Sequence, residues 1–225
     1  MSGSSQFKAV LFDLDGTLVD TAPDLVATLM ALRSRRGLPS LDPGTLRHHA
    51  SRGALGLLEA GFSDQAESEP SRMRDEFLAH YARNLWHLSR PFDGIEPMLD
   101  RLANAGFALG VVTNKPGYLT RPLLEQAGWA GRFGCVVAGD TMARAKPYPD
   151  PVLEACRRLD MDPASCVFVG DDRRDVEAGR AARVATIVAS WGYIPPDEDA
   201  LAWGADWQIE RPGDLLAMLA GEVLE

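Results

Sequence analysis

The pattern of hydrophobic and polar residues changes near residue 92. Before that point, one short apolar run at 9–12 is followed by segments whose apolar residues recur at helical spacing, and no strand is expected between 18 and 92. The first of these segments begins near Thr21, which with Asp24 resembles a helix-capping pair, and it stops at Gly37. The other predicted helices cover 43–50, 53–61 and 71–88, with a polar linker at 63–70.

After residue 92, short apolar runs alternate with amphipathic segments. The predicted strands are 108–112, 135–138, 166–169, 185–189 and 207–209. The predicted helices are 95–105, 118–127, 149–159, 173–182 and 213–220. Strand–helix alternation over this length favours right-handed crossovers and a parallel sheet. We therefore predict an α/β fold, with a Rossmann-like core from residues 1–19 and 92–225 and a helical cap domain at 20–91.

Composition narrows the class of protein. The chain has 225 residues, of which 46% are hydrophobic, and this is enough for a core with an inserted domain. The net charge of −9 argues against a nucleic-acid partner, because such binding needs a basic face. No apolar run approaches the length of about 18 residues that a membrane span requires, so no membrane partner is expected.

The cysteines and the N-terminal residues indicate where the protein works. Cys135, Cys156 and Cys166 are widely spaced in apolar segments, so we interpret them as buried residues of a reducing compartment. Residues 1–6 lack the basic-then-apolar order of a signal peptide and are expected to form a frayed tail. These features predict a soluble cytoplasmic protein, with the oligomeric state left open between monomer and homodimer.

The apolar run at 9–12 ends in two carboxylates one residue apart, Asp13 and Asp15, followed by Gly16 and Thr17. Side chains alternate along a strand, so the two carboxylates would point the same way. They would repel each other unless a cation lay between them or one were protonated. Open α/β sheets bind ligands at this end of their strands, so Asp13 could act as a nucleophile and cation ligand and Asp15 as a general acid/base. The alternative is a strand that ends in a solvated acidic turn.

Three later segments carry polar groups beside strand ends. Thr113 and Asn114 follow one strand and can donate to phosphate oxygens, although Thr-Asn is also an ordinary turn. Lys146, before a proline, would reduce carboxylate repulsion if it points inward; otherwise it is an exposed lysine. Asp171 follows another strand and could share a cation with Asp13.

The helix predicted after Asp171 begins beside two further acids. Asp175 is expected to cap this helix and to orient the site indirectly. Asp172 is interpreted as loop structure or as a ligand of outer-shell water.

The order D-x-D-G-T, T-N, K-P and G-D-x-x-x-D resembles the four motifs of the haloacid dehalogenase superfamily of phosphatases, and the helical insert after the first motif is similar to its C1 cap. The resemblance implies that Asp13, the Asp15 carbonyl and Asp171 hold Mg²⁺. It further implies that Asp13 forms an aspartyl phosphate while Asp15 protonates the leaving oxygen. By the same resemblance, Thr113, Asn114 and Lys146 would bind the substrate by holding the phosphoryl oxygens.

Within this superfamily the chain resembles the phosphoglycolate phosphatases and, more narrowly, the N-acetylmuramic acid 6-phosphate phosphatases. The segments that carry the likeness are 111–116, 159–165, 168–175, 192–194 and 203–206. The expected substrate is therefore a small-molecule phosphate ester. In the cap, Arg47 and Arg52 are candidates for contact with a substrate anion. A phosphomutase, a generalist sugar-phosphate phosphatase and a catalytically silent binding module are the alternatives.

Overall fold

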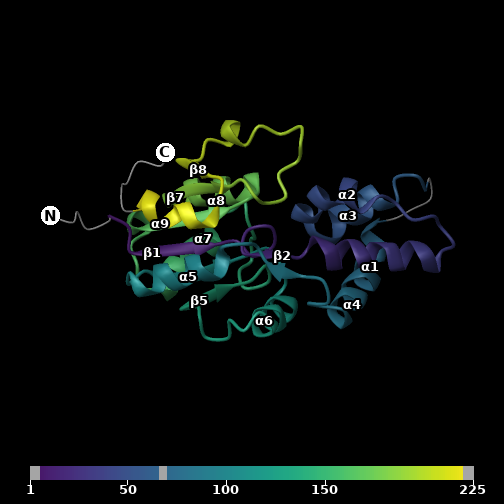
Figure 1. Ribbon diagram of the computed structural model, residues 1–225, viewed down its shortest axis with the longest axis horizontal. Helices are drawn as coiled ribbons and strands as arrows, with labels where there is room; N and C mark the ends of the chain where they lie inside the picture. Colours follow the sequence, from purple (N-terminus) through teal and green to yellow (C-terminus); the bar gives the residue numbers. More distant parts are fainter. Residues whose placement is uncertain (1–5, 66–69, 220–225) are drawn as a thin grey trace.

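The computed structural model describes residues 6–65 and 70–219, which form a sheet-based core with a helical domain at one end (Figure 1). Some predictions fall outside these residues: nearly all of the N-terminal tail, the middle of the linker predicted at 63–70, and the last residue of the helix predicted at 213–220. Among the described residues, no helix is both long and apolar enough to cross a bilayer.

The core is a parallel sheet, as the alternation of strands and helices predicted. Within the described residues it contains six strands in the order β5-β4-β1-β6-β7-β8. The strands are β1 (Ala9–Phe12), β4 (Ala108–Val112), β5 (Cys135–Val137), β6 (Cys166–Gly170), β7 (Ala185–Ala189) and β8 (Trp207–Ile209). In the register, Val10 faces Leu109 on one side and Val167 on the other. This arrangement confirms the predicted fold class.

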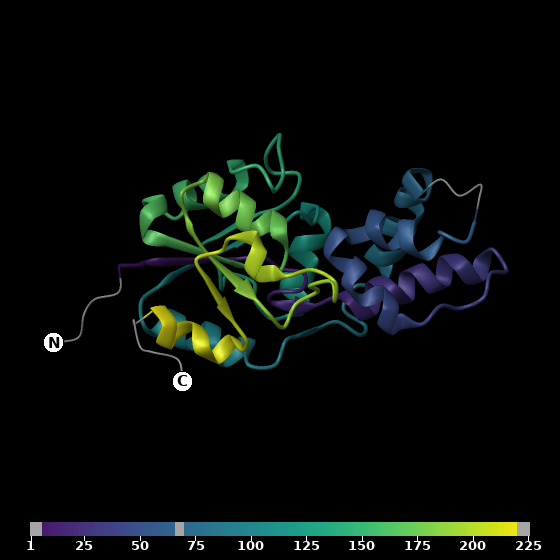
Figure 2. The ribbon, with the colours of Figure 1, turned by 90° about the horizontal axis from the view of Figure 1, so that it is seen from above.

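Strand β1 lies in the middle of the sheet and is buried on both faces. Val10 and Phe12 pack into the core layer that also holds α5 (Ile95–Asn104) and α9 (Leu215–Leu219). Ala9 and Leu11 point to the opposite layer, with α7 (Asp150–Arg158) and α8 (Arg173–Ala181). Figure 2 shows the two helix layers on either side of the sheet. Burial on both faces explains why β1 reads as a continuous apolar run.

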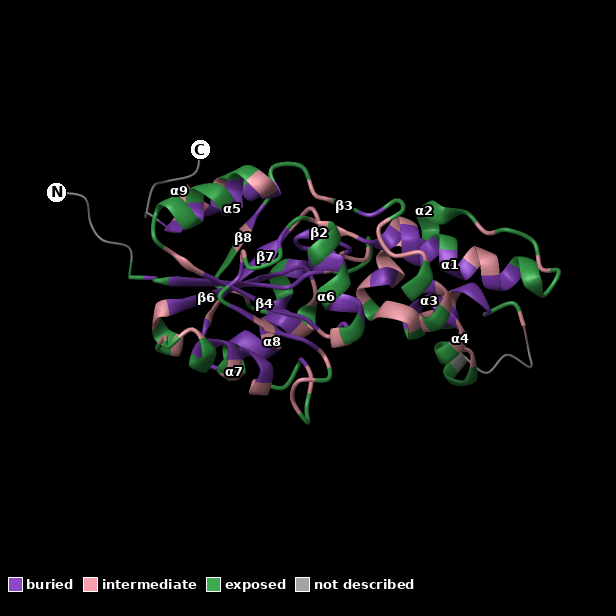
Figure 3. Cartoon of the chain, turned by 90° about the horizontal axis from the view of Figure 1, so that it is seen from below, coloured by how far each residue is buried: buried purple, intermediate pink, exposed green. Residues whose placement is uncertain are grey.

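The helical cap contains α1 (Ala22–Arg35), α2 (Pro43–Leu46), the 3₁₀ helix η1 (Arg47–Arg52), α3 (Gly53–Gly61) and α4 (Pro70–Arg83). Its inner faces bury a separate apolar cluster that includes Leu29, Leu58 and Phe77 (Figure 3). Two helices differ from the prediction. The helix expected at 43–50 is divided into α2 and η1, and the helix expected to reach residue 88 ends at Arg83.

The chain enters and leaves the cap through a short antiparallel ribbon, β2 (Val19–Asp20) with β3 (Arg90–Pro91). The expectation of no strand between 18 and 92 was wrong, because two-residue strands are too short to produce a periodic pattern. The ribbon holds the two connections side by side at the base of the cap.

The expected capping pair at the start of α1 was also wrong. The Thr21 hydroxyl makes no capping bond and donates instead to Asp15 Oδ1 over 2.5 Å. The Asp24 carboxylate accepts from the backbone N–H groups of Leu88 and Ser89, both over 2.9 Å. Both side chains therefore connect the start of the cap to other segments rather than to their own helix.

Helix α6 (Gly117–Gln126) follows β4 and lies on the side of the core that faces the cap (Figure 1). Two core residues, Leu119 and Tyr193, pack into the apolar cluster of the cap. The Tyr193 hydroxyl also lies 2.6 Å from the backbone nitrogen of Thr21, which donates to it. The cap therefore contacts the core through buried side chains as well as through the ribbon.

Candidate active site

The strand order reverses direction at β1, since β4 and β5 lie on one side of it and β6, β7 and β8 on the other. Such a switch point, at the carboxyl ends of the strands, is where open α/β sheets bind ligands. Asp13 directly follows β1, and its backbone N–H donates to the carbonyl of Val169 at the end of β6 over 2.9 Å. The sheet ladder thus continues into the site and holds Asp13 at this edge.

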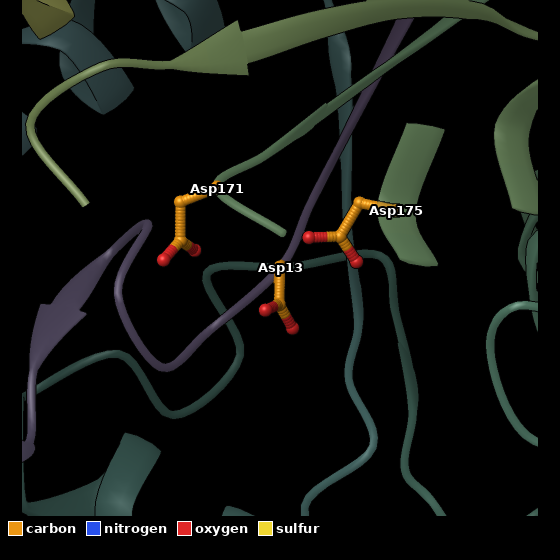
Figure 4. Close-up of side chains that lie close together, drawn as sticks. All are labelled: Asp13, Asp171 and Asp175. Atoms are coloured by element: carbon orange, nitrogen blue, oxygen red, sulfur yellow. The ribbon is translucent and has the colours of Figure 1, made fainter. Parts of the chain in front are cut away.

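Three buried carboxylates meet beside β1 (Figure 4). Asp13, Asp171 and Asp175 each offer an oxygen, and these oxygens lie within 4.8 Å of one another. Asp171 accepts from the Thr17 hydroxyl over 2.7 Å and from the backbone N–H of Tyr193 over 2.8 Å. The predicted proximity of Asp13 and Asp171 is therefore present in the structure, and Asp175 joins them.

Gly16 allows this approach. Its φ is +89°, and a Cβ atom placed there would lie 2.1 Å from Asp171 Oδ2. Any larger residue would collide with the carboxylate and would also be strained at this φ. The glycine of the first motif is thus required for both the turn and the close contact.

Burial and mutual repulsion disfavour the ionised forms of the clustered carboxylates. Burial raises the pKa of Asp171 well above its ordinary value, and the charges of Asp13 and Asp175 add to the effect. Burial also raises the pKa of Asp175, to about 7, although Lys146 opposes the shift. A divalent cation would relieve this repulsion, and a set of hard carboxylate oxygens fits such an ion. The cluster therefore suggests a divalent-metal site.

Lys146 points inward toward the carboxylates. Of the two alternatives left open by the sequence, the inward-pointing lysine is therefore the one present in the structure. Its Nζ atom lies 2.8 Å from Asp13 Oδ1 and 2.7 Å from Asp175 Oδ1, and it donates to the carbonyl of Val112 over 2.9 Å. Burial alone would lower the pKa of Lys146. The negative charges of Asp13 and Asp175 have the larger effect, so the pKa of Lys146 lies above its ordinary value. Lys146 is therefore a fixed cation between two carboxylates.

Thr113 and Asn114 both line the pocket described below, but their hydrogen bonds differ from those of a simple phosphate clamp. The Asn114 amide donates to the Lys146 carbonyl over 2.9 Å and accepts from the Lys146 backbone N–H over 3.0 Å. Asn114 thus holds the loop that carries Lys146. The Thr113 hydroxyl accepts from the backbone N–H of Lys115 over 3.1 Å, which leaves its own proton free to donate.

Lys115 was missed by the sequence interpretation. Its buried Nζ donates to Asp15 Oδ1 over 2.8 Å and to the Tyr81 hydroxyl, from α4 of the cap, over 3.1 Å. Burial lowers the pKa of Lys115, but Asp15 and Tyr81 raise it above its ordinary value. The sequence placed Lys115 in the T-N-K-P segment, but nothing in it distinguished this lysine from an exposed one.

Arg174 was also missed. Its guanidinium donates to both carboxylate oxygens of Asp172, over 2.7 and 2.9 Å, and to the carbonyl of Ser51 in the cap over 2.7 Å. Asp172 and Asp175 form a capping box at the start of α8, which confirms the capping role expected for Asp175. Asp172, interpreted as loop structure, also anchors this contact between core and cap.

A pocket of about 270 Å³ opens over these groups, between the core and the cap. Its core side includes Asp13, Asp15, Thr113, Asn114 and Lys146. Its cap side includes Leu25, the segment 50–55, Arg74, Leu78 and Tyr81. The phosphate-handling residues expected from the motifs therefore share one pocket with apolar and basic residues of the cap.

The two cap arginines expected near substrate are placed differently. Arg52 lines the pocket, with its guanidinium paired to Glu59 over 2.7 Å. Arg47 is not among the described residues that line the pocket. Its Nη1 atom lies 2.9 Å from both Asp20 carboxylate oxygens, and its guanidinium lies 5.2 Å from the centre of the Tyr193 ring. Arg47 therefore connects the cap to the base of the ribbon.

Comparison with known proteins identifies the family. Residues 10–189 match the model of the haloacid dehalogenase-like hydrolases. The chain is 43% identical to the N-acetylmuramic acid 6-phosphate phosphatase of Pseudomonas aeruginosa, with 95% of each chain covered. It is 44% identical to a phosphoglycolate phosphatase of Xanthomonas campestris, with 92% of this chain and 94% of the relative covered.

The fold agrees with these matches. A crystal structure of a predicted phosphoglycolate phosphatase from Haemophilus somnus superposes with a TM-score of 0.85 at 29% identity, and the alignment covers 96% of this chain and 99% of that one. The family model covers most of the chain, including all four motif segments, and the relatives align with more than nine tenths of it. The protein therefore belongs to the haloacid dehalogenase-like hydrolases.

Proposed function

We propose that this protein is a Mg²⁺-dependent phosphomonoesterase that works through an aspartyl phosphate on Asp13. The observation that carries the proposal is the placement of Asp13 and Asp15 at the end of β1, facing a pocket roofed by the cap. Lys146, 2.8 Å from Asp13, supplies a buried positive charge at the same point. A carboxylate nucleophile, a second carboxylate and a fixed cation are the groups that in-line phosphoryl transfer needs.

In the first step, an Asp13 carboxylate oxygen attacks phosphorus and the ester bond to the leaving alcohol breaks, while Asp15 donates a proton to the leaving oxygen. In the second step, Asp15 takes a proton from water, the water oxygen attacks phosphorus, and phosphate leaves Asp13. Lys146 and the Thr113 hydroxyl stabilise the charge on the phosphoryl oxygens in both steps. Lys115 and Thr21 hold the Asp15 carboxylate in place.

Asp13, Asp171 and the backbone carbonyl of Asp15 would hold Mg²⁺, and the ion would neutralise part of the charge of the phosphoryl group and the carboxylates. Asp175, paired with Lys146, would keep that lysine in position. The cluster of buried carboxylates supports this assignment. The expected result is that EDTA abolishes phosphate release from p-nitrophenyl phosphate and that added Mg²⁺ restores it.

The substrate is proposed to be N-acetylmuramic acid 6-phosphate or 2-phosphoglycolate, because the similar proteins carry these two activities. A panel of phosphate-release assays tests this. It compares both esters with hexose and pentose phosphates by kcat/KM. A preference of about a hundredfold, near 2.7 kcal/mol of transition-state discrimination, would identify the substrate. Isomer formation without phosphate release would favour a phosphomutase, and no turnover at all would favour a silent binding module.

We further propose that residues 1–19 and 92–225 act as the catalytic core and that 20–91 act as a cap that excludes bulk water during the reaction. The contact of Arg174 with the Ser51 carbonyl supports this, because it ties the cap loop to the same helix start that carries Asp175. A cytoplasmic location and a monomeric or homodimeric state stay predictions.

A further inference from the structure

The pocket contains several cations, and most of them are already paired. Lys146 lies between Asp13 and Asp175, and Lys115 pairs with Asp15. The other paired cations are Arg174, with Asp172, and Arg52, with Glu59. A cation that is paired with a carboxylate has less positive charge to offer a second anion.

Arg74 is different. It lines the pocket and is exposed, and among residues 6–65 and 70–219 its guanidinium has no hydrogen-bond or ion-pair partner. It lies on α4 four residues before Leu78 and seven before Tyr81, so the three side chains share one face of the helix. All three line the pocket. Arg74 is therefore a free positive charge directed at the substrate space.

The helix also sets how far Arg74 lies from the reacting groups. Tyr81 marks the inner end of this face, because its hydroxyl accepts from Lys115, which in turn holds Asp15. Seven residues of α-helix span about 10 Å, and helical side chains lean toward the N-terminus, which here means away from Tyr81. Arg74 thus occupies the outer end of the pocket.

The space between the two ends is apolar on the cap side. Leu78 lies between Arg74 and Tyr81 on α4, and Leu25 and Leu55 line the same pocket. A ligand that meets both ends must therefore carry two anionic groups separated by a body of several atoms with apolar surface. The volume of about 270 Å³ suits a leaving group of sugar size better than a two-carbon one.

We propose that Arg74 binds a carboxylate on the leaving group of the substrate, at the end remote from the phosphate. The inference rests on the proposed phosphatase function and selects between its two substrates. In N-acetylmuramic acid 6-phosphate the carboxylate is on a lactyl group across the sugar ring from the phosphate. In 2-phosphoglycolate it is separated from the ester oxygen by a single CH₂ group, which is too short to reach Arg74. The sugar acid is therefore the expected substrate.

The experiment compares Arg74→Gln with wild type on esters with and without the carboxylate. N-acetylmuramic acid 6-phosphate carries it, whereas N-acetylglucosamine 6-phosphate and p-nitrophenyl phosphate do not. Loss of a charge-assisted hydrogen bond is expected to lower kcat/KM for the first ester roughly 10- to 100-fold, mainly through KM. The measured quantity is the ratio of kcat/KM for the ester with the carboxylate to kcat/KM for the esters without it. A smaller fraction of folded protein would lower all the values equally and leave this ratio unchanged.

Arg83→Gln is the matched control. Arg83 is an exposed arginine on the same helix, but it lies nine residues from Arg74, on the opposite face, and it does not line the pocket. The ester ratio of this variant is expected to match that of wild type.

Four results would overturn the inference: an equal loss on all esters, no loss in Arg74→Gln, a carboxylate-dependent loss in Arg52→Gln instead, or a wild-type preference for 2-phosphoglycolate. Failure of the proposed function looks different. In that case the wild-type protein would release no phosphate from any ester in the presence of Mg²⁺, and the inference would fail with it.

Discussion

The core end and the cap end of the pocket use charge in different ways. At the core end, Lys146 has a side chain that is 3% exposed and lies between two carboxylates. At the cap end, Arg52 has a side chain that is 57% exposed and pairs with a surface glutamate. Arg74 is exposed and has no ion-pair partner among the residues that the structure describes. Buried, paired charges form a rigid environment for a charged transition state. Exposed charges contribute little to stability but remain available to a ligand.

On the proposed assignment of roles, the residues that carry out the reaction and those that recognise the substrate lie at opposite ends of the pocket. The groups proposed for phosphoryl transfer follow β1, β4 and β6 or lie close to their ends, so the sheet fixes their positions. The cap residues of the pocket come from separate helices, which can change without disturbing the sheet. Variants at the two ends should therefore behave differently, both in activity and in stability.

The largest effect is expected at the core end, from Asp13→Asn. The amide has nearly the same volume but is not a nucleophile, so turnover should fall by roughly 10⁴-fold or more. Phosphate release measures the loss, and thermal unfolding should show a protein that still folds. Activity near the wild-type level would contradict the assignment of Asp13 as the nucleophile.

Lys146→Met tests whether the buried charges also stabilise the core. The change leaves Asp13 and Asp175 without their shared cation, so the free energy of unfolding in EDTA should fall by about 3–5 kcal/mol. Urea unfolding measures it. Adding Asp175→Asn to the variant should recover part of the loss, since one uncompensated carboxylate is removed.

Arg52→Gln is the counterpart of this change at the cap end. Removal of its exposed pair should cost less than about 1 kcal/mol. Equal losses of unfolding free energy in Lys146→Met and Arg52→Gln would contradict the proposed difference between the core end and the cap end of the pocket.

The stability of the metal-free protein should fall as the pH rises. The pKa of Asp175 is about 7 in the folded protein and 3.8 ordinarily, so between these values the folded state binds a proton that the unfolded state has released. Stability is then lost as the pH rises through this window, by about 2–4 kcal/mol from pH 5 to pH 8. Urea unfolding in EDTA at the two pH values tests the sign.

Asp175→Asn is the control for this pH dependence, because it removes one of the two groups responsible. Asp171, whose pKa is also raised by burial and by Asp13 and Asp175, should retain part of the effect. Stability that rises with pH in the wild-type protein would contradict the arrangement of carboxylates described above.

A smaller effect than that of Lys146→Met is expected where the two ends meet, from Tyr81→Phe. The variant loses the hydroxyl that accepts from Lys115, but the ring stays below the ammonium group, 4.6 Å from Nζ to the ring centre, and Lys115 keeps Asp15. We expect a loss of about 1–2 kcal/mol in unfolding free energy and less than a tenfold change in kcat/KM. A loss as large as that of Lys146→Met would mean that the cap contact is as important as the core pairs.

Part of this arrangement was predictable because it depends on local pattern. The alternation after residue 92 predicted the parallel sheet, and carboxyl ends of parallel strands meet at one edge, so Asp13 and Asp171 were expected together. Lys146 was expected to join them only because the K-P motif resembles that of the superfamily. The ribbon of β2 and β3 was not predicted, because its strands have two residues each.

The role of each basic residue was less predictable. Lys115, Arg174 and Arg74 carry the same charge as many surface residues, and the sequence does not show which of them is buried, which is paired and which is free. Arg47, one of the two cap arginines predicted to contact a substrate anion, pairs with Asp20 outside the pocket lining.

The sequence by itself determined the α/β class, the four motif segments and the position of the helical insert, because each depends on residue type and spacing over a few neighbours. The tertiary structure alone decided that Asp175 joins the carboxylate cluster, that Lys115 links Asp15 to the cap, and that Arg74 lines the pocket without an ion pair to any residue of 6–65 or 70–219. The physical reason is that burial and pairing of a charge depend on segments far apart in the chain, which only folding brings into contact.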